Sequence, residues 1–318
     1  MIQYTFKNYI SGGVEHYVYG EEYTNDTVIS SQATAFPDSL LSLVYMDIDT
    51  VEPLIQKLND ALWQLPLSQD KQYQQSACAL LDELAPYHIY FQQFRLDWKY
   101  RISRAMIFDR FTEDVLPRKY LYELPETLRR MQAQIIDLFK NVLDIDNGTE
   151  AVPQRMAAYY KTAGEHAFRF HPQPVGFELI NDEIFTEVLE PHSVYDLIDY
   201  HLRECVKQEV KMRVCKNCGR YFAITGRTTT EYCNRPFDSR GRTCKEVGAI
   251  AQWTLSKRDD DVFKDYRREY KKRFARMKAG TLPAEEFYAW SKKAREKKAA
   301  HDSGKIPQEE YIVWLKES

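Results

Sequence analysis

Four cysteines are the residues of this chain whose spacing is best suited to chemistry. Cys215 and Cys218 form a Cys-x-x-Cys pair, and Cys233 and Cys244 follow on a separate segment. Zinc binds thiolate sulfur at about 2.3 Å in a tetrahedron, so one tight pair of thiolates needs two further ligands. The spacing therefore predicts one zinc ion held by all four cysteines. Because four thiolates leave no position for water, we expect this zinc to be structural rather than catalytic.

The residues around the cysteines predict their local structure. Gly219 can turn the backbone with a positive φ, and the flanking segments 211–214 and 220–224 have the composition of short β-strands. Thr243 is a suitable N-cap for a helix over residues 244–255, which places the Cys244 thiolate at the positive end of the helix dipole. A knuckle followed by a ligand-bearing helix start predicts a treble-clef-like zinc module.

Disulfides or scattered core thiols are the alternative explanation for the cysteines. The first 20 residues lack the apolar segment of a signal peptide, and the chain contains no apolar run of membrane-spanning length. We therefore expect a cytoplasmic protein with no membrane partner, in a reducing compartment that favours metal binding over disulfides. Cys78 and Cys205 lie in apolar helical contexts and are expected to be buried thiols. His201 and Cys205 are one helical turn apart, which leaves a second ligand pair open.

Catalytic motifs are scarce. The chain has no phosphate-binding loop, nucleophile elbow, zinc-protease helix or dinucleotide-binding fingerprint. Two sets of residues could contribute to catalysis: Glu165, His166 and His171 around a predicted strand, and Asp182, Glu209 and Lys211, which loosely match a metal-dependent nuclease. Such residues are more often surface or satisfied core groups. No histidine lies between His201 and His301 to serve a treble-clef nuclease. Catalysis therefore ranks behind the two binding functions given below.

Charge is distributed unevenly along the chain. Residues 211–318 contain 26 Lys and Arg against 15 Asp and Glu, whereas residues 1–210 contain 18 against 32. Two parts of opposite charge suggest two functions. With 318 residues and 44% hydrophobic content, the chain can build more than one core. We predict an acidic, mostly helical domain over residues 1–210, a zinc-binding module over 211–256, and a basic helix with repeated short helices over 257–318.

The predicted fold class is α+β, mainly α. Alternating residues on either side of Gly12 and Gly13 predict an N-terminal β-hairpin. Helices are expected from about residue 51 onward, including one over residues 124–143 and one that is capped by Ser193 and ends near residue 210. A second short β element is expected at residues 167–170 and 176–180. The apolar residues at helical spacing that we expect in the core are Leu54, Leu58, Leu62 and Leu65, followed by Tyr87, Phe91, Phe94, Trp98 and Ile102.

The C-terminal tail contains an internal repeat. Residues 257–278 predict one long helix with an aromatic face and cations elsewhere. After it, the pattern Gly-x-x-Pro-x-Glu-Glu occurs at Gly280 and again at Gly304. A glycine that ends one helix, a proline at the first position of the next and two glutamates near its positive end predict two equivalent short helices. Their expected anchors in the packing are Phe287, Trp290, Tyr311 and Trp314.

The cysteine cassette carries a family resemblance. It reads Cys215-Lys-Asn-Cys218-Gly-Arg-Tyr-Phe, then Glu-Tyr-Cys233, then Thr-Cys244-Lys-Glu-Val-Gly, and it resembles the C-terminal part of a bacterial family classed as a domain of unknown function. More distantly, it is similar to the CGNR-type zinc finger of bacterial transcription regulators, in which a helical region precedes a four-cysteine finger and a basic helix. The resemblance covers about residues 211–278 and implies DNA binding. The segment between Cys233 and Cys244 is longer than in that finger, and Cys-Gly-Asn-Arg is replaced by Cys244-Lys-Glu-Val.

Two functions from different classes follow. In the first, the chain is a zinc-binding bacterial protein that binds nucleic acid, as a regulator or a mobile-element accessory factor, while its acidic domain binds a partner protein. In the second, zinc staples a scaffold for protein assembly and no nucleic acid binds. The cationic surplus favours the first. The side chains expected to contact nucleic acid are Arg220, Arg227, Lys264, Arg267, Arg268, Lys271, Lys272 and Arg276.

Overall fold

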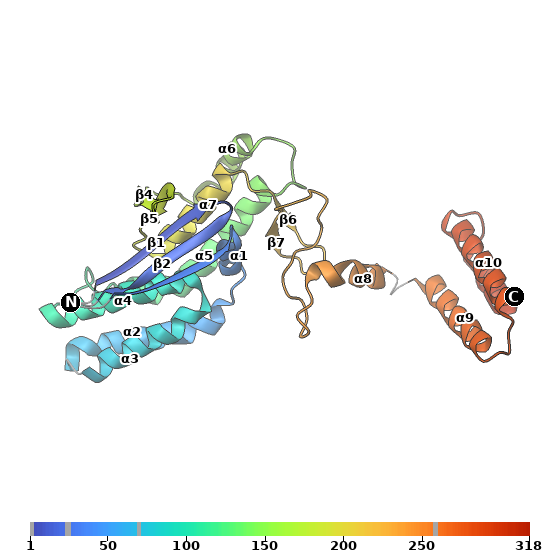
Figure 1. The fold of residues 1–318 in the computed structure, drawn as a ribbon, viewed down its shortest axis with the longest axis horizontal. Helices are drawn as coiled ribbons and strands as arrows, with labels where there is room; N and C mark the ends of the chain where they lie inside the picture. Colours follow the sequence, from blue (N-terminus) through green and yellow to red (C-terminus); the bar gives the residue numbers. More distant parts are fainter. Residues whose placement is uncertain (1–2, 23–26, 69–70, 257–259) are drawn as a thin grey trace. The chain divides into compact units, whose positions relative to one another are not determined.

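The computed structural model describes residues 3–22, 27–68, 71–256 and 260–318. It is mainly helical with an antiparallel sheet near its N-terminus, which confirms the predicted fold class (Figure 1). The chain forms two compact units, one of Met1–Cys215 with Gly219–Glu231 and one of Lys216–Cys218 with Tyr232–Ser318. The three-part division at residues 210 and 256 stays a prediction. Within the described ranges, none of the helices combines the length and apolar character needed to cross a bilayer.

The first unit contains a five-stranded antiparallel sheet with the strand order β3-β2-β1-β5-β4. The strands are β1 (Gln3–Ser11), β2 (Val14–Glu22), β3 (Thr27–Ala35), β4 (Val175–Ile180) and β5 (Ile184–Leu189). Gly12 and Gly13 have φ values of 59° and 77°, the left-handed geometry of a two-residue hairpin turn. β1 and β2 pair along their whole length across this turn. The predicted N-terminal hairpin is therefore present as the centre of a larger sheet.

The second β element lies later in the chain than predicted. β4 and β5 pair through a turn at Asn181 and Asp182, whose φ values are 50° and 59°. Residues 167–170 form no strand, so that prediction is wrong; Ala167 and Phe168 are instead buried in the core. The rings of Phe168 and Tyr195 stack with centroids 5.7 Å apart, and Phe168 N donates to the Tyr159 hydroxyl at 3.4 Å, so helices hold this segment in place of a strand partner. β3 was not expected from the sequence, because residues 28–33 are exposed and carry no alternating apolar pattern.

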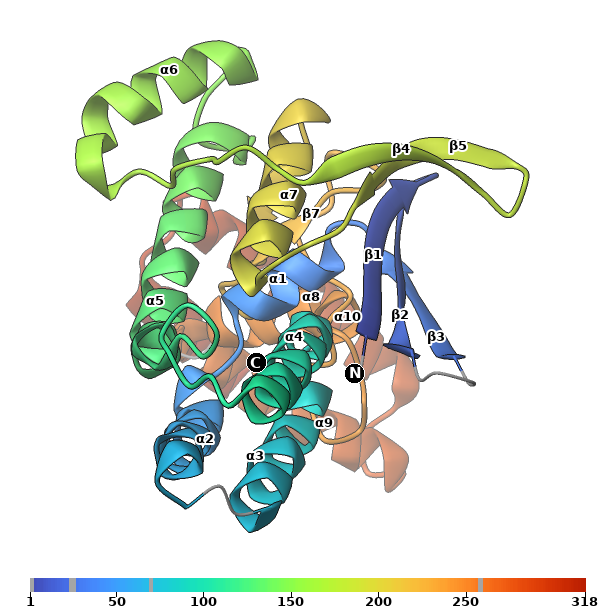
Figure 2. The ribbon, with the colours of Figure 1, turned by 90° about the vertical axis from the view of Figure 1, so that its left-hand side faces the viewer.

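Helices cover one face of this sheet. α4 packs against β1 and β2, α1 packs against β3, and α7 packs against both helices, while α2 and α3 pair with each other (Figure 2). α5 contacts α1 and α2. The α-helices of this unit are α1 (Asp38–Val44), α2 (Ile48–Ser68), α3 (Lys71–Leu84), α4 (Ile89–Phe108), α5 (Arg118–Leu138), α6 (Val152–Ala163) and α7 (Val194–Lys207). Shorter turns are η1 (Ala85–Tyr87), the π-helical η2 (Phe139–Leu143) and η3 (Gly164–His166).

The core contains nearly all of the apolar residues expected there. The four leucines of α2 are buried, and so are the expected residues of α4 from Phe91 to Ile102. Tyr87 is an exception at 45% exposure. His88 is the N-cap of α4 and its ring accepts a hydrogen bond from Tyr90 N, so the helical repeat begins after Tyr87. Ser193 caps α7 through a reciprocal capping box with Asp196, as predicted.

A polar network lies inside this apolar core. Glu15, Tyr17, Tyr90 and His201 are each fully buried. The Tyr17 hydroxyl lies 2.7 Å from Oε2 of Glu15 and 3.2 Å from Nε2 of His201, whose Nδ1 lies 2.7 Å from the carbonyl oxygen of Leu197. Burial raises the pKa of Glu15 to about 7 and lowers the pKa of His201 to about 4. The Tyr17 hydroxyl donates to Glu15, and burial favours the neutral forms of both Glu15 and His201.

The helices of the second unit are α8 (Cys244–Ser256), α9 (Asp261–Lys278), α10 (Ala284–Asp302) and α11 (Gln308–Glu317). The Asp260 side chain caps α9 by accepting from Phe263 N at 2.8 Å, and residues 257–259 of the predicted long helix lie outside the described residues. α9, α10 and α11 pack on one another around Val262, Ala294, Tyr311 and Leu315.

The repeated start signals build the turns of this helical bundle. Gly280 and Gly304 have φ values of 74° and 73°, which suit the glycine that follows a helix. Pro283 and Pro307 have ψ values of 140° and 158°, so each is an N-cap and not the first helical residue, one position from the expectation. The predicted anchors are packed: Phe287 and Tyr311 are buried, and the rings of Trp290 and Trp314 stack with centroids 6.4 Å apart.

Candidate metal centre and cationic surface

A short β-hairpin positions the first two cysteines. β6 (Met212–Val214) and β7 (Tyr221–Ala223) pair antiparallel, as predicted, and the knuckle lies between them. Gly219 has a φ of 71°, and its N–H donates to the carbonyl oxygen of Cys215 at 2.9 Å. Cys215 N donates to the Arg220 carbonyl at the same distance. These bonds close a tight turn that brings the side chains of Cys215 and Cys218 to one side.

A helix start positions the other two cysteines. Cys244 is the first residue of α8, and Thr243 forms a reciprocal capping box with Glu246: Thr243 N donates to Oε2 of Glu246 at 2.7 Å, and Glu246 N donates to Oγ1 of Thr243 at 3.3 Å. Lys245 N donates to the Cys233 carbonyl at 3.0 Å, which joins the two ligand-bearing segments. The predicted N-cap is therefore present, and it places the Cys244 sulfur at the positive end of a helix.

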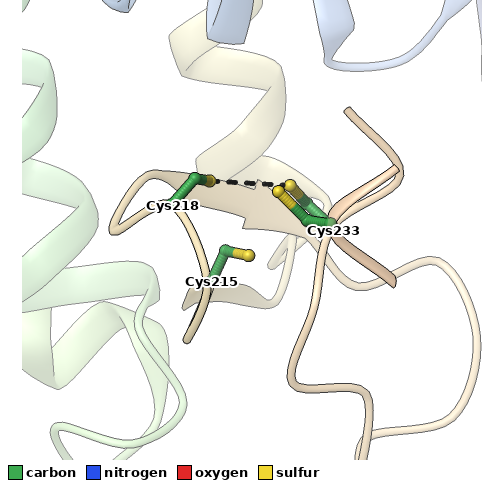
Figure 3. Close-up of side chains that lie close together, drawn as sticks. Cys215, Cys218 and Cys233 are labelled. Carbon is green, nitrogen blue, oxygen red and sulfur yellow. Dashed lines mark hydrogen bonds between the residues drawn. The ribbon is translucent and has the colours of Figure 1, made fainter. Parts of the chain in front are cut away.

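The four sulfur atoms converge on one point. All four Sγ atoms lie within 4.8 Å of one another. Figure 3 shows Cys215, Cys218 and Cys233 side by side, and the sulfur atoms of Cys218 and Cys233 are 3.8 Å apart. A tetrahedral ion with metal–sulfur bonds of about 2.3 Å requires sulfur pairs about 3.8 Å apart. Cys215, Cys233 and Cys244 are buried, and none of the chain's six cysteines, all in the described ranges, forms a disulfide. The cluster could therefore hold a metal ion.

Side chains around the cluster support this arrangement. Asn217 Nδ2 lies 3.3 Å from the Cys244 sulfur, and Gln252 Nε2 donates to the Lys216 carbonyl at 2.5 Å, linking the knuckle to α8. Gly248 faces the ring of Tyr232, the residue before Cys233, so closely that a β-carbon there would overlap the ring. The glycine of the cassette is thus required by close packing and not by an unusual backbone angle.

The knuckle hairpin is also anchored inside the first unit. Tyr221 donates through its hydroxyl to Asp144 Oδ2 at 3.0 Å and through its backbone N–H to the Tyr45 hydroxyl at 2.6 Å. Arg213 binds Asp146 through two nitrogens at 2.7 and 2.8 Å, and its third nitrogen donates to the carbonyl oxygens of Thr228 and Thr230. Several hydrogen bonds therefore hold the hairpin that carries the cysteine knuckle.

The cations predicted to contact nucleic acid are all exposed. Arg220 lies over the ring of Tyr45 at 5.2 Å, and Arg227 lies in the loop after β7. The buried side chains of α9 include Val262, Glu269 and Arg273. The exposed cations of α9 are Lys264, Arg267, Arg268, Lys271, Lys272, Arg276 and Lys278. Arg273 is 7% exposed, with its guanidinium 4.7 Å from the Trp290 ring centroid, and so is excluded from this surface.

Three of these cations form ion pairs on α9 itself. Lys264, Arg268 and Lys272 lie 2.8, 3.2 and 3.8 Å from acidic side chains of the same helix. Among the described residues, no acidic partner lies within ion-pair distance of Arg267 or Lys271, which are one helical turn apart. Exposed pairs of this kind contribute at most about 1 kcal/mol and open readily. Arg267 and Lys271 are therefore two neighbouring exposed cations of α9 that an anionic ligand could contact.

Two further groups of cations were not predicted from the sequence as contacts for nucleic acid. Arg235, Arg240 and Arg242 lie between the third and fourth cysteines, and Lys292 and Lys293 are exposed on α10. The surplus of positive charge in residues 211–318 includes both groups, but the sequence does not show which of these cations are exposed.

The other candidate sites do not assemble. Within the residues that the structure describes, the four-cysteine cluster is the one group of three or more acidic, histidine or cysteine side chains able to hold a metal, so Asp182 and Glu209 form no such site. His201 faces Glu15 and Tyr17 in the core. Glu165, His166 and His171 are exposed, and the backbone N–H of His171 donates to Asp199. These positions do not form a catalytic constellation.

Comparison with known proteins gives a match to one family model. Residues 175–314 match the model of a family of unknown function (DUF6076). No curated protein and no solved structure matches the chain. The matched segment runs from β4 through the cysteine cluster to α11, so the similarity extends beyond the cysteine cassette. The similarity to the CGNR-type finger and the treble-clef assignment stay predictions.

Proposed function

We propose that this chain is a zinc-dependent nucleic-acid-binding protein. The observation that carries the proposal is the cationic face of α9, on a chain segment that follows a preformed four-thiolate cluster. Its acidic N-terminal unit would bind a partner protein. A regulator or a mobile-element accessory factor of the bacterial cytoplasm fits such a division of roles, and so does the likeness of the cassette to CGNR-type fingers.

Zinc is the metal that this donor set fits best. Four thiolates in a closed tetrahedron are typical of structural zinc, and thiolates bound to the ion stay deprotonated at neutral pH. Zinc would link the knuckle to the start of α8 and so hold a small module that has few apolar residues of its own. No catalytic role for the metal is proposed.

Elemental analysis tests the metal assignment. We expect one zinc per chain in the purified protein and in Cys78→Ser, which changes a thiol outside the cluster. Cys218→Ser should lose the zinc and leave residues 232–256 accessible to limited proteolysis. Protein that lacks zinc and still resists protease over this segment would contradict the assignment.

Nucleic acid is proposed as the ligand because exposed Lys and Arg neutralise phosphates and release condensed counterions. Such contacts position a protein on nucleic acid without reading its sequence. Arg267 and Lys271 are exposed one turn apart, and reversing their charges disrupts no ion pair among the described residues. These two side chains are therefore the sharpest probes of the proposal.

Fluorescence anisotropy with labelled duplex and single-stranded oligonucleotides at low salt is the experiment. Wild-type protein should bind with micromolar or lower Kd, and Arg267→Glu with Lys271→Glu should weaken binding at least about tenfold. The matched control is Lys119→Glu with Arg130→Glu, which reverses two exposed charges of α5 and makes the same change in net charge. If both double variants lose the same affinity, the loss comes from net charge alone, which would contradict a binding site on α9.

A protein-interaction scaffold is the second candidate, and the β4–β5 hairpin favours it. Phe177 and Phe185 are 67% and 70% exposed, and their rings stack with centroids 5.7 Å apart. β4 is an edge strand, which offers unpaired backbone groups as well as apolar side chains. If no nucleic acid binds at low salt, this exposed hairpin becomes the leading candidate for the functional surface.

A further inference from the structure

The segment between the third and fourth cysteines forms a small hairpin, which we call the arginine hairpin (residues 234–243). Pro236 and Thr243 pair as an antiparallel bridge. Phe237 N donates to the Arg242 carbonyl at 2.7 Å, and Cys244 N donates to the Arg235 carbonyl at 3.0 Å. Both ends of the hairpin therefore continue directly into residues of the candidate metal centre.

Asp238 fixes the tip of the arginine hairpin. Its Oδ1 accepts hydrogen bonds from the backbone N–H groups of Arg240 and Arg242 at 3.0 and 3.1 Å, and its Oδ2 accepts from Arg242 Nε at 2.7 Å. Gly241 has a φ of 73°, a left-handed conformation that glycine adopts at low cost. A ten-residue loop that could have been mobile is thus tied at its base by two cysteines and at its tip by one carboxylate.

This rigid hairpin holds one aromatic ring in solvent. Phe237 is 51% exposed although its backbone N–H is bonded within the hairpin. Arg240, three residues further on, is also exposed, and the hairpin carries three arginines against one aspartate. A single exposed phenylalanine is common on protein surfaces. A phenylalanine held on a preorganised turn among arginines is the arrangement with which proteins stack on bases and contact the adjoining phosphates.

We propose that Phe237 stacks on an unpaired base of single-stranded nucleic acid while Arg240 contacts a neighbouring phosphate. This inference rests on the proposed nucleic-acid function and adds the substrate class. In a duplex both faces of each base are already covered by its neighbours, so a ring on a hairpin tip gains a partner only where bases are unstacked. Because every base has a π-face, stacking tolerates different sequences and selects single strands over duplex.

The test measures anisotropy of the full-length, zinc-loaded protein with a labelled oligo-dT, an oligo-U and a duplex of equal length at one salt concentration. Phe237→Leu keeps an apolar side chain but has no π-system, so it should weaken single-strand binding about 5- to 100-fold and change duplex binding little. Phe237→Trp keeps an aromatic ring, so it should bind single strands like wild type. Tyr288→Ala, which removes another aromatic side chain at 63% exposure, is the matched control and should bind as wild type.

The results distinguish base stacking by Phe237 from phosphate binding by α9. If Phe237→Leu binds all probes like wild type while the Arg267 and Lys271 reversal weakens binding, stacking is wrong and the phosphate-binding function stands. If Phe237→Leu weakens duplex and single strand equally, the ring does not select unpaired bases and the inference is overturned. If wild-type protein binds no probe at low salt, the proposed function fails and the inference fails with it. Zinc content of one per chain in each variant confirms that the hairpin is intact.

Discussion

The polar network of Glu15, Tyr17 and His201 makes the first unit sensitive to pH. Burial raises the pKa of the Glu15 carboxyl to about 7 in the folded state, whereas in the unfolded chain the exposed carboxyl releases its proton near pH 4.5. Between these values the folded state binds the extra proton, and the free energy of unfolding falls as pH rises. Burial lowers the pKa of His88 and His201 to about 4 from 6.5, so these residues act in the opposite direction, and their contribution is lost as pH falls.

Glu15→Gln tests this account. The amide oxygen of glutamine can accept the hydrogen bond from Tyr17 as the carboxyl oxygen does, but the amide does not ionise. The unfolding free energy of the variant minus that of wild type should therefore rise by about 3 kcal/mol from pH 4.5 to pH 8.5. Urea unfolding followed by circular dichroism at both pH values, with zinc present in excess, measures this change. A wild-type to variant difference that is the same at both pH values would show that Glu15 does not hold a proton in the fold.

The role of a residue could be predicted from the sequence where it depends only on neighbouring residues in the chain. The spacing of Cys215 and Cys218 is enough to predict a metal site, and Thr243 predicts the start of α8. Glu15 and His201 carry no such signal, because they are far apart in sequence and meet only when α7 packs on the sheet. Phe237 was missed for a related reason: its exposure depends on the turn that Asp238 and Gly241 impose.

At the scale of the elements, the contact between Gly248 of α8 and Tyr232 joins the helix to the segment that carries Cys233. Gly248→Ala places a methyl group where the ring lies. We expect it to destabilise the module by about 1 to 3 kcal/mol, the usual cost of overpacking, and to release zinc at a lower chelator concentration. Gly226→Ala is the matched control, because nothing lies within 4 Å of the added methyl group there. If both variants release zinc at the same chelator concentration, the packing of Gly248 against Tyr232 does not stabilise the module.

The three-helix bundle of α9, α10 and α11 depends on its aromatic anchors. Phe287 is 1% exposed, whereas its neighbour Tyr288 is 63% exposed. Phe287→Ala should cost about 3 to 5 kcal/mol of bundle stability, and Tyr288→Ala should cost little. Limited proteolysis of residues 260–318 at increasing temperature compares the two variants. Cleavage of the wild-type bundle at the lowest protease dose would contradict a packed bundle altogether.

Elements were predicted well where one segment carries its own pattern. The helical spacing of the α2 leucines and the repeated glycine, proline and glutamate signals gave helices at nearly the observed positions. The sheet was predicted only in part. Its central hairpin has a Gly-Gly turn, but β3 lacks an apolar face, and the pairing of β5 with β1 joins segments that are remote in sequence. Such long-range pairing leaves no periodic signal in either strand.

For the whole molecule, the charge distribution is the property that a binding function would use. Residues 211–278 carry 19 Lys and Arg against 8 Asp and Glu, and most of the cations that the structure describes there are exposed. The N-terminal part has the opposite sign, so it would repel phosphates and leave the C-terminal part to contact them. The match of residues 175–314 to one family model spans the cationic part together with the cysteine cluster.

The salt dependence of nucleic-acid affinity shows whether the cations of α9 contact phosphates. If about five cations meet phosphates, the logarithm of the affinity for duplex DNA should fall against the logarithm of salt concentration with a slope of about −4 to −5. Reversing Arg267 and Lys271 should bring that slope to about −3, and the Lys119 and Arg130 reversal should leave it unchanged. A slope near zero, or one that the α9 variant does not alter, would contradict nucleic-acid binding by this surface.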